Sequence, residues 1–168
     1  MTRRTSNPAG SAAGRFRDRI FDDPRHDPYQ SKEKYAEPTR CRVCGAAYHK
    51  GHWQWSAPPD SAHEDVCPAC RRIHDKMPAG TLIVDGPFVA AHRQDLLNLV
   101  HNEAEHERSE HPLNRVMRVD ETGGRIEIST TDIHSPQRIG EALKHAYDGE
   151  LSIQYGHDDY TVRVHWQR

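Results

Sequence analysis

The sequence predicts an α+β fold: a small four-cysteine zinc ribbon, then a ferredoxin-like β-α-β-β-α-β-β sandwich, with a disordered tail at the N-terminus. Three observations predict it. Four cysteines form two close pairs, apolar residues gather in the second half of the chain, and strand and helix patterns alternate there. Of the 27 Leu, Ile, Val and Phe residues, 21 lie between Thr81 and Trp166. The second half can therefore build a core, whereas the first half needs other support.

Residues 78–168 carry the patterns of five strands and two helices. Alternation of apolar residues indicates the strands, and recurrence every three or four residues indicates the helices. The first helix should begin at Pro87, and the second at Ser135-Pro136, where serine is the expected N-cap. Gly123-Gly124 predicts a hairpin turn. The strands are expected over residues 81–85, 116–120, 125–130, 151–155 and 162–166.

This order of elements is the split βαβ arrangement of ferredoxin-like folds, with one strand added at the C-terminus. Because the strands alternate, both helices are expected to cover one face of the sheet. The other face should be open and polar. Its predicted residues are Arg125, Glu127, Ser129, Ser152, Gln154, Thr161, Arg163 and His165.

The two cysteine pairs have the spacing of zinc knuckles. Two residues between cysteines let one turn direct both sulfurs at one ion, and Gly45 permits a positive φ after the first pair. Four thiolates suit a tetrahedral Zn²⁺ and leave no position open for water. We therefore predict one structural zinc that stabilises the apolar-poor residues 38–77. Its ligands should be Cys41, Cys44, Cys67 and Cys70.

Other interpretations of the cysteines and histidines are less favoured. A redox Cys-x-x-Cys pair or an iron–sulfur cluster uses similar motifs, but two facing pairs beside glycine and proline favour zinc. Three histidines between the knuckles are additional ligand candidates, although four cysteines already complete the site. The histidines of the first long helix are five residues apart, which predicts a solvated helix end. These histidines are His49, His52 and His63, and His101, His106 and His111.

The N-terminal residues 1–37 are basic at first and contain few apolar side chains, which predicts a disordered or extended tail. No run is long and apolar enough to span a bilayer, and no apolar segment follows the first arginines as in a secretory signal. Two tight cysteine pairs fit a reducing compartment. We therefore expect a cytoplasmic protein that does not enter a membrane.

The cysteine region resembles a known family. The residues concerned are Cys41-Arg-Val-Cys-Gly, Gly51-His-Trp53, Cys67-Pro-Ala-Cys70-Arg-Arg-Ile and the strand from Thr81 to Gly86. Together they resemble the second zinc-binding half of the adaptor that carries the large ribosomal subunit through nuclear export. Short bacterial proteins of uncharacterised role look similar from Cys41 to the C-terminus. The adaptor's further cysteine pairs, later domains and leucine-rich export signal are missing here, so the resemblance does not imply nuclear export.

The resemblance implies a zinc-supported module that contacts a ribosomal subunit or its RNA. Arginines near the zinc and in the tail supply cations for phosphate contacts. Trp53 is a stacking candidate, although packing on the zinc knuckles is the favoured interpretation of its ring. A role in ribosome maturation or dormancy is a hypothesis. The alternative is a protein-interaction adaptor without RNA contact. With no nucleophile elbow, convincing triad or phosphate loop, we expect no enzyme. The predicted RNA-binding residues are Arg3, Arg4, Arg15, Arg17, Arg19, Arg40, Arg42, Arg71, Arg72 and Trp53.

Overall fold

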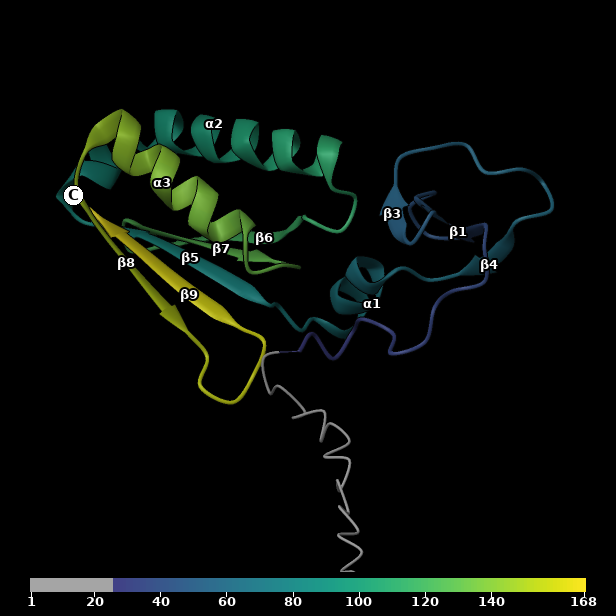
Figure 1. Ribbon diagram of the computed structural model, residues 1–168. Helices are drawn as coiled ribbons and strands as arrows, with labels where there is room; N and C mark the ends of the chain where they lie inside the picture. The colour runs from purple at the N-terminus through teal and green to yellow at the C-terminus, as the bar shows by residue number, and fades with distance from the viewer. Residues whose placement is uncertain (1–25) are drawn as a thin grey trace, which may run out of the picture.

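The structure is a computed structural model of the 168-residue chain, and it describes residues 26–168. These residues form two β-sheets and three helices, and the mixed α+β class is confirmed. Figure 1 shows a small sheet at one end of the molecule and a larger sheet, with two helices over it, at the other.

The small sheet has four short strands in the order β3-β2-β1-β4. Strands β1, β2 and β3 pair antiparallel, whereas β4 runs parallel to β1. Tight turns connect the antiparallel strands, with positive φ at Gly45 and Gly51. A short helix, α1, then begins directly after Cys67. The elements are β1 (Thr39–Cys41), β2 (Ala47–His49), β3 (His52–Gln54), β4 (His63–Asp65) and α1 (Pro68–Asp75).

The second half contains the expected series of seven elements in the expected order. The Pro87 helix continues to Glu110, and the strands match the predicted ranges to within two residues. The elements are β5 (Gly80–Asp85), α2 (Pro87–Glu110), β6 (Val116–Thr122), β7 (Arg125–Thr130), α3 (Ser135–Tyr147), β8 (Glu150–Tyr155) and β9 (Val162–Gln167).

The larger sheet follows the ferredoxin-like arrangement in one half only. Its order is β6-β7-β5-β9-β8, and β7 is antiparallel to both β5 and β6, as in a split βαβ unit. A ferredoxin-like sheet would place β8 directly beside β5. Here β9 lies between them, parallel to β5 and antiparallel to β8. The added C-terminal strand is therefore internal, and β8 forms an edge.

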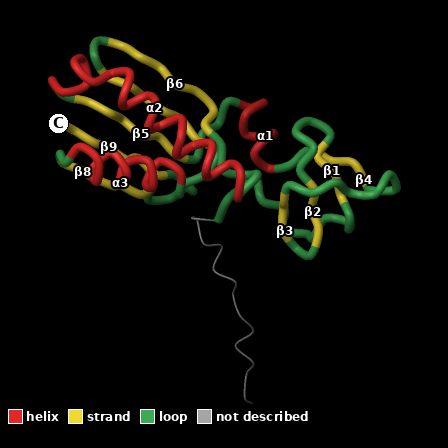
Figure 2. The backbone as a smooth tube through the Cα atoms, turned by 90° about the horizontal axis from the view of Figure 1, so that it is seen from above, coloured by secondary structure: helices red, strands yellow, loops and turns green. Residues whose placement is uncertain are grey.

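Helices α2 and α3 cover one face of this sheet (Figures 1 and 2). The core between the layers is apolar and includes Leu82, Leu96, Ile128, Ile139 and Trp166, each without exposed surface. The opposite face carries the polar residues expected of it. Arg125, Glu127, Ser152, Gln154 and Arg163 are exposed, while Ser129, Thr161 and His165 are half-buried.

The start of α3 differs in detail from the prediction. Ser135 is the first helical residue instead of the N-cap. The capping oxygens come from Asp132, whose carboxylate accepts bonds from the backbone N–H groups of His134 and Ser135 and from the Ser135 hydroxyl. A carboxylate at a helix N-terminus satisfies unpaired donors and complements the helix dipole.

Residues 26–37 belong to the predicted tail, yet they contact the cysteine region. Tyr35 packs against the rings of Tyr48 and Trp53, with ring centroids 5.0 and 5.2 Å away. Asp27 forms an ion pair with the buried Arg72. Contacts with the small sheet and α1 thus begin well before residue 37. The rest of the predicted tail, residues 1–25, lies outside the described residues.

Candidate metal centre

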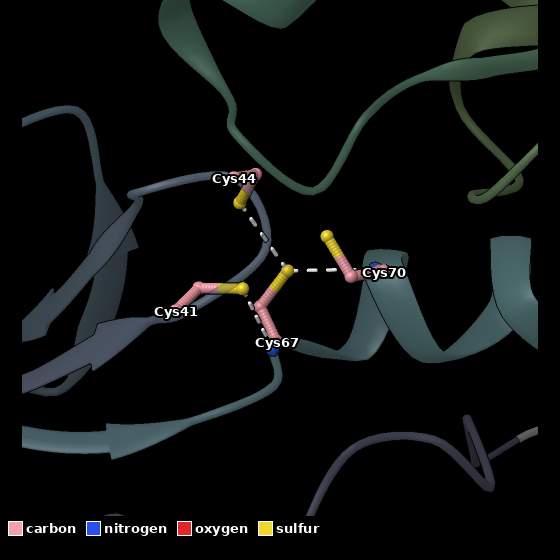
Figure 3. Close-up of side chains that lie close together, drawn as sticks. All are labelled: Cys41, Cys44, Cys67 and Cys70. Carbon is pink, nitrogen blue, oxygen red and sulfur yellow. Dashed lines mark hydrogen bonds between the residues drawn. The ribbon is translucent and has the colours of Figure 1, made fainter.

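The four cysteine sulfurs lie within 4.8 Å of one another. Figure 3 shows their side chains converging from the end of β1, the turn after it, and the first turn of α1. Tetrahedral zinc with Zn–S bonds of about 2.3 Å places its sulfurs about 3.8 Å apart. The Sγ atoms of Cys44 and Cys67 are 3.8 Å apart. The four side chains can therefore hold one metal ion.

Local backbone structure positions both pairs. In the first, Gly45 donates its N–H to the carbonyl of Cys41 at 2.8 Å, and its φ of 80° closes the turn that brings Cys44 back to Cys41. In the second, Cys67 is the N-cap of α1, and its sulfur accepts the N–H of Cys70 at 3.5 Å. A helix N-terminus favours negative charge, so it stabilises thiolates.

Three of the four cysteines are buried, and Cys44 is half-buried. Cys41 is 1% exposed, Cys67 is 0% and Cys70 is 6%. The Cys67 thiol donates toward Cys44, and Arg115 lies beside it. Together they lower the pKa of Cys44 to about 4. One thiolate is therefore favoured even before a metal binds, and a metal ion would favour deprotonation of the others.

Arg115, in the loop after α2, is the cation of this site. Its guanidinium donates to Cys44 Sγ at 3.0 Å and to Cys70 Sγ at 3.3 Å, and it lies 3.8 Å from Cys67 Sγ. Its Nε donates to the carbonyl of Pro112, and its side chain is buried. Thiolates raise the pKa of Arg115 even though burial opposes this. A guanidinium bonded to the ligands offsets the excess negative charge of four thiolates around a divalent ion.

Sequence reasoning did not identify Arg115. It lies 45 residues beyond the last cysteine, in the half of the chain assigned to the other sheet, and the prediction of separate parts gave no reason to join them. The cysteine motif contains no signal for it.

The aromatic residues of the region form a cluster, not a stacking surface. Tyr48 and Trp53 are each 8% exposed, and their ring centroids lie 5.6 Å apart. Together with Tyr35 they pack against the buried cysteines. Trp53, a predicted stacking candidate whose favoured alternative was packing on the knuckles, lies buried in this cluster.

The arginines near the cysteines divide into exposed and buried members. Arg42 and Arg71 are exposed, and Arg40 is half-buried. Arg40 pairs with Glu64, and Arg71 pairs with Asp65. Arg72 is only 4% exposed, because it pairs with Asp27 and lies over the ring of Tyr29. Arg72, another predicted RNA contact, is thus bound to partners within the chain, and an RNA contact by it stays a prediction. Arg3, Arg4, Arg15, Arg17 and Arg19 fall outside the described residues.

The histidines do not join the cysteines. Within residues 26–168, the only group of three or more potential ligands close enough to share a metal ion is the cysteine cluster. His49, His52 and His63 are all exposed. No helix in the same range is long and apolar enough to cross a membrane.

No known protein family, curated protein or solved structure matches this chain. The resemblance to the export adaptor therefore remains a prediction that rests on the residues quoted for it.

Proposed function

We propose that this chain is a non-enzymatic cytoplasmic factor in which one structural zinc ion holds a surface for binding a ribosomal subunit or its RNA. The observation that carries the zinc assignment is the closed cluster of four sulfurs, with spacing that suits a tetrahedral ion. Cys41, Cys44, Cys67 and Cys70 would be the ligands. With four thiolates bound, zinc would supply folding energy to an apolar-poor region instead of activating water.

The contact surface proposed for RNA lies beside the zinc. Arg42 is exposed, and the two neighbouring arginines form only surface ion pairs, Arg40 with Glu64 and Arg71 with Asp65. Such pairs contribute about 0–1 kcal/mol, so phosphate groups can replace their carboxylates. The tail arginines would add to these contacts. Support for a ribosomal partner in particular comes from the resemblance of the cysteine region, and a role in maturation or dormancy rests on it as well.

A second candidate is a protein-interaction adaptor, and the same surface offers a specific reason. Val43 is 66% exposed at the tip of the first knuckle, and Ile73 is 40% exposed on α1. With Val66 they line a groove of about 630 Å³, with Arg42 and Arg71 among its other residues. Exposed aliphatic residues with polar neighbours are typical of a protein contact.

Cosedimentation with ribosomal particles separates these candidates. Binding through phosphates should be present at low salt and lost at high salt, and Arg42→Glu should weaken it. Arg125→Glu, on the open face of the larger sheet, is the matched control and should leave binding unchanged. If the protein is absent from every ribosomal fraction at low salt, the ribosomal proposal fails. Binding that resists salt but is lost in Val43→Asp would favour the protein adaptor.

A further inference from the structure

The two edges of the larger sheet differ in how they are protected against pairing. Edge strands of monomeric proteins usually carry charges, prolines or bulges that prevent contact with another strand. Strand β6 has these features: a register shift lies between Val116 and Arg118, and Arg118 pairs with Asp120 on the strand itself. Its Glu121 pairs with Arg93 of α2.

Strand β8, at the other edge (Figure 1), carries one charged residue, Glu150 at its first position, and has no proline or bulge. Its residues 151–155 are Leu-Ser-Ile-Gln-Tyr, with no charge, proline or glycine, and its register with β9 is unbroken. Among the described residues, β9 is the only strand that pairs with β8. One whole side of its backbone therefore has no strand partner within residues 26–168.

The hydrogen bonds beside β8 show which backbone groups face outward. Gly156 donates its N–H to the Thr161 carbonyl at 2.9 Å, so the backbone of Gly156 points toward β9. Val162, the first residue of β9, instead donates its N–H to the carbonyl of Ala79, on the side away from β8. Since backbone direction alternates along a strand, Gln154 and Ser152 also point toward β9. The N–H and C=O groups of Leu151, Ile153 and Tyr155 therefore face the open edge.

The same three residues carry apolar side chains on the helix-covered face. They lie opposite the buried Trp166, Val164 and Val162 of β9, and opposed residues share a face. Ile153 is nevertheless 37% exposed and Tyr155 is 60% exposed. The open edge of β8 thus offers a row of unused backbone groups with partly exposed apolar side chains beside it.

We propose that the β8 edge pairs antiparallel with the β8 edge of a second copy of this chain, about a two-fold axis at Ile153. Ile153 then lies opposite its own copy, and Leu151 lies opposite Tyr155. All the outward N–H and C=O groups of the three residues find partners, and the two sheets join into one. In this register Glu150 lies opposite Gly156 of the other copy, so it faces no like charge. The exposed apolar side chains form one continuous row.

Other registers fit less well. An axis at Ser152 pairs Leu151 with Ile153 and sets Tyr155 opposite Gly149, which lies before β8 begins. A shift of one residue would set apolar side chains against residues of the open polar face, because opposed residues share a face. The register centred on Ile153 is the one that uses the whole unprotected segment.

Amide hydrogen exchange measured by NMR on the full chain, at several protein concentrations, tests the proposal. The amides of Leu151, Ile153 and Tyr155 should become protected as concentration rises, together with a doubling of mass in sedimentation equilibrium. The amides of Ser152 and Gln154 face β9 and should be protected throughout. A monomer at every concentration, or protection of the three amides that does not depend on concentration, would overturn the pairing with a second copy.

Two variants of Ile153 and a control sharpen the test. Ile153→Lys places two ammonium groups opposite each other and should raise the dimer dissociation constant by about a hundredfold or more. Ile153→Pro removes an N–H that makes no bond within the sheet, so it should prevent dimerisation with β8 still paired to β9. Val119→Lys, on the protected β6 edge, should leave the dimer unchanged. If folded Ile153→Lys dimerises as well as the native chain does, the proposal is wrong.

Discussion

Arg115 connects the two halves of the molecule through the cysteine site. Its backbone N–H donates to the Thr131 hydroxyl oxygen, and its carbonyl accepts the Thr131 N–H. Its side chain ends among the sulfurs of Cys44, Cys67 and Cys70. Arg115 thereby ties the backbone of one half to the cysteine site of the other.

We predict that Arg115→Ala weakens zinc affinity by about 10- to 100-fold, the usual effect of removing a residue that bonds to metal ligands. The zinc affinity of Arg115→Lys should fall between those of the native chain and Arg115→Ala. An ammonium keeps the charge but cannot bond to two sulfurs in the fork geometry of a guanidinium. Competition with a chromogenic chelator measures the affinity. Arg118→Ala is the control, since that side chain is 73% exposed, and equal affinities for Arg115→Ala and Arg118→Ala would contradict the role assigned to Arg115.

Asp132 is the second residue whose role is visible only in three dimensions. Its side chain caps α3, and it is 7% exposed. Asp132→Ala should lower the free energy of unfolding by about 1–2 kcal/mol, because two backbone donors lose their partner. Asp132→Asn keeps one acceptor oxygen, so it should lower the free energy of unfolding by less than Asp132→Ala does. Denaturant unfolding of the zinc-loaded chain measures both, and an unchanged midpoint for Asp132→Ala would show that the cap contributes nothing.

At the scale of elements, periodicity in the sequence was sufficient to predict the helices and strands of the second half of the chain. Val89, Leu96 and Val100 recur at helical spacing and are buried on α2, and Ile126 and Ile128 alternate as buried residues of β7. The pairing order was not predictable in full. Both β8 and β9 alternate in the same way, so local pattern does not show which of them lies beside β5. That choice depends on long-range packing.

In the first half of the chain, the clustering of the four cysteines could be predicted from the sequence, but the strands could not. The cysteine spacing identified the four sulfurs that the structure brings together. The strands β1 to β4 have three residues each, too short for a periodic signal. Glu107 shows a related limit: it lies in an acidic stretch typical of a solvated helix end, yet it is 1% exposed and bonds to Asn114 and Arg138.

The two halves have separate apolar clusters, one around the cysteines and one between the larger sheet and its helices. Cys67→Ser should therefore unfold the cysteine region while residues 81–166 stay folded. Limited proteolysis with mass spectrometry should find cuts within residues 38–77 and a resistant C-terminal fragment. Ser61→Ala, in the loop before β4, is the control and should resist cleavage. Loss of the whole chain would mean that Arg115, together with the bond from Trp55 to the Arg108 carbonyl, joins the halves into one cooperative unit.

Charge is distributed unevenly over the whole molecule. Residues 78–168 contain nine lysines and arginines against fifteen aspartates and glutamates, whereas residues 1–25 contain six against three. An acidic larger sheet repels phosphate, so any RNA contact should use the cysteine side of the molecule and the N-terminal segment.

This uneven charge leads to a prediction for the N-terminal segment. Deleting residues 1–25 should weaken low-salt association with ribosomal particles and reduce its salt dependence, since fewer phosphate counterions are then released. Residues 26–37 should be kept in this variant, because they contact Tyr48, Trp53 and Arg72. Cosedimentation over a salt series measures the effect, and an unaltered salt dependence would exclude the segment from the contact.

The structural zinc is the claim on which the account of the cysteine half depends, and metal analysis of the purified, folded chain tests it most directly. Inductively coupled plasma mass spectrometry should find one zinc per chain and no stoichiometric iron. Zinc should be lost in Cys67→Ser, and its removal by a chelator should unfold residues 38–77. A chain that keeps this region folded with substoichiometric zinc, or that contains iron in its place, would contradict the account.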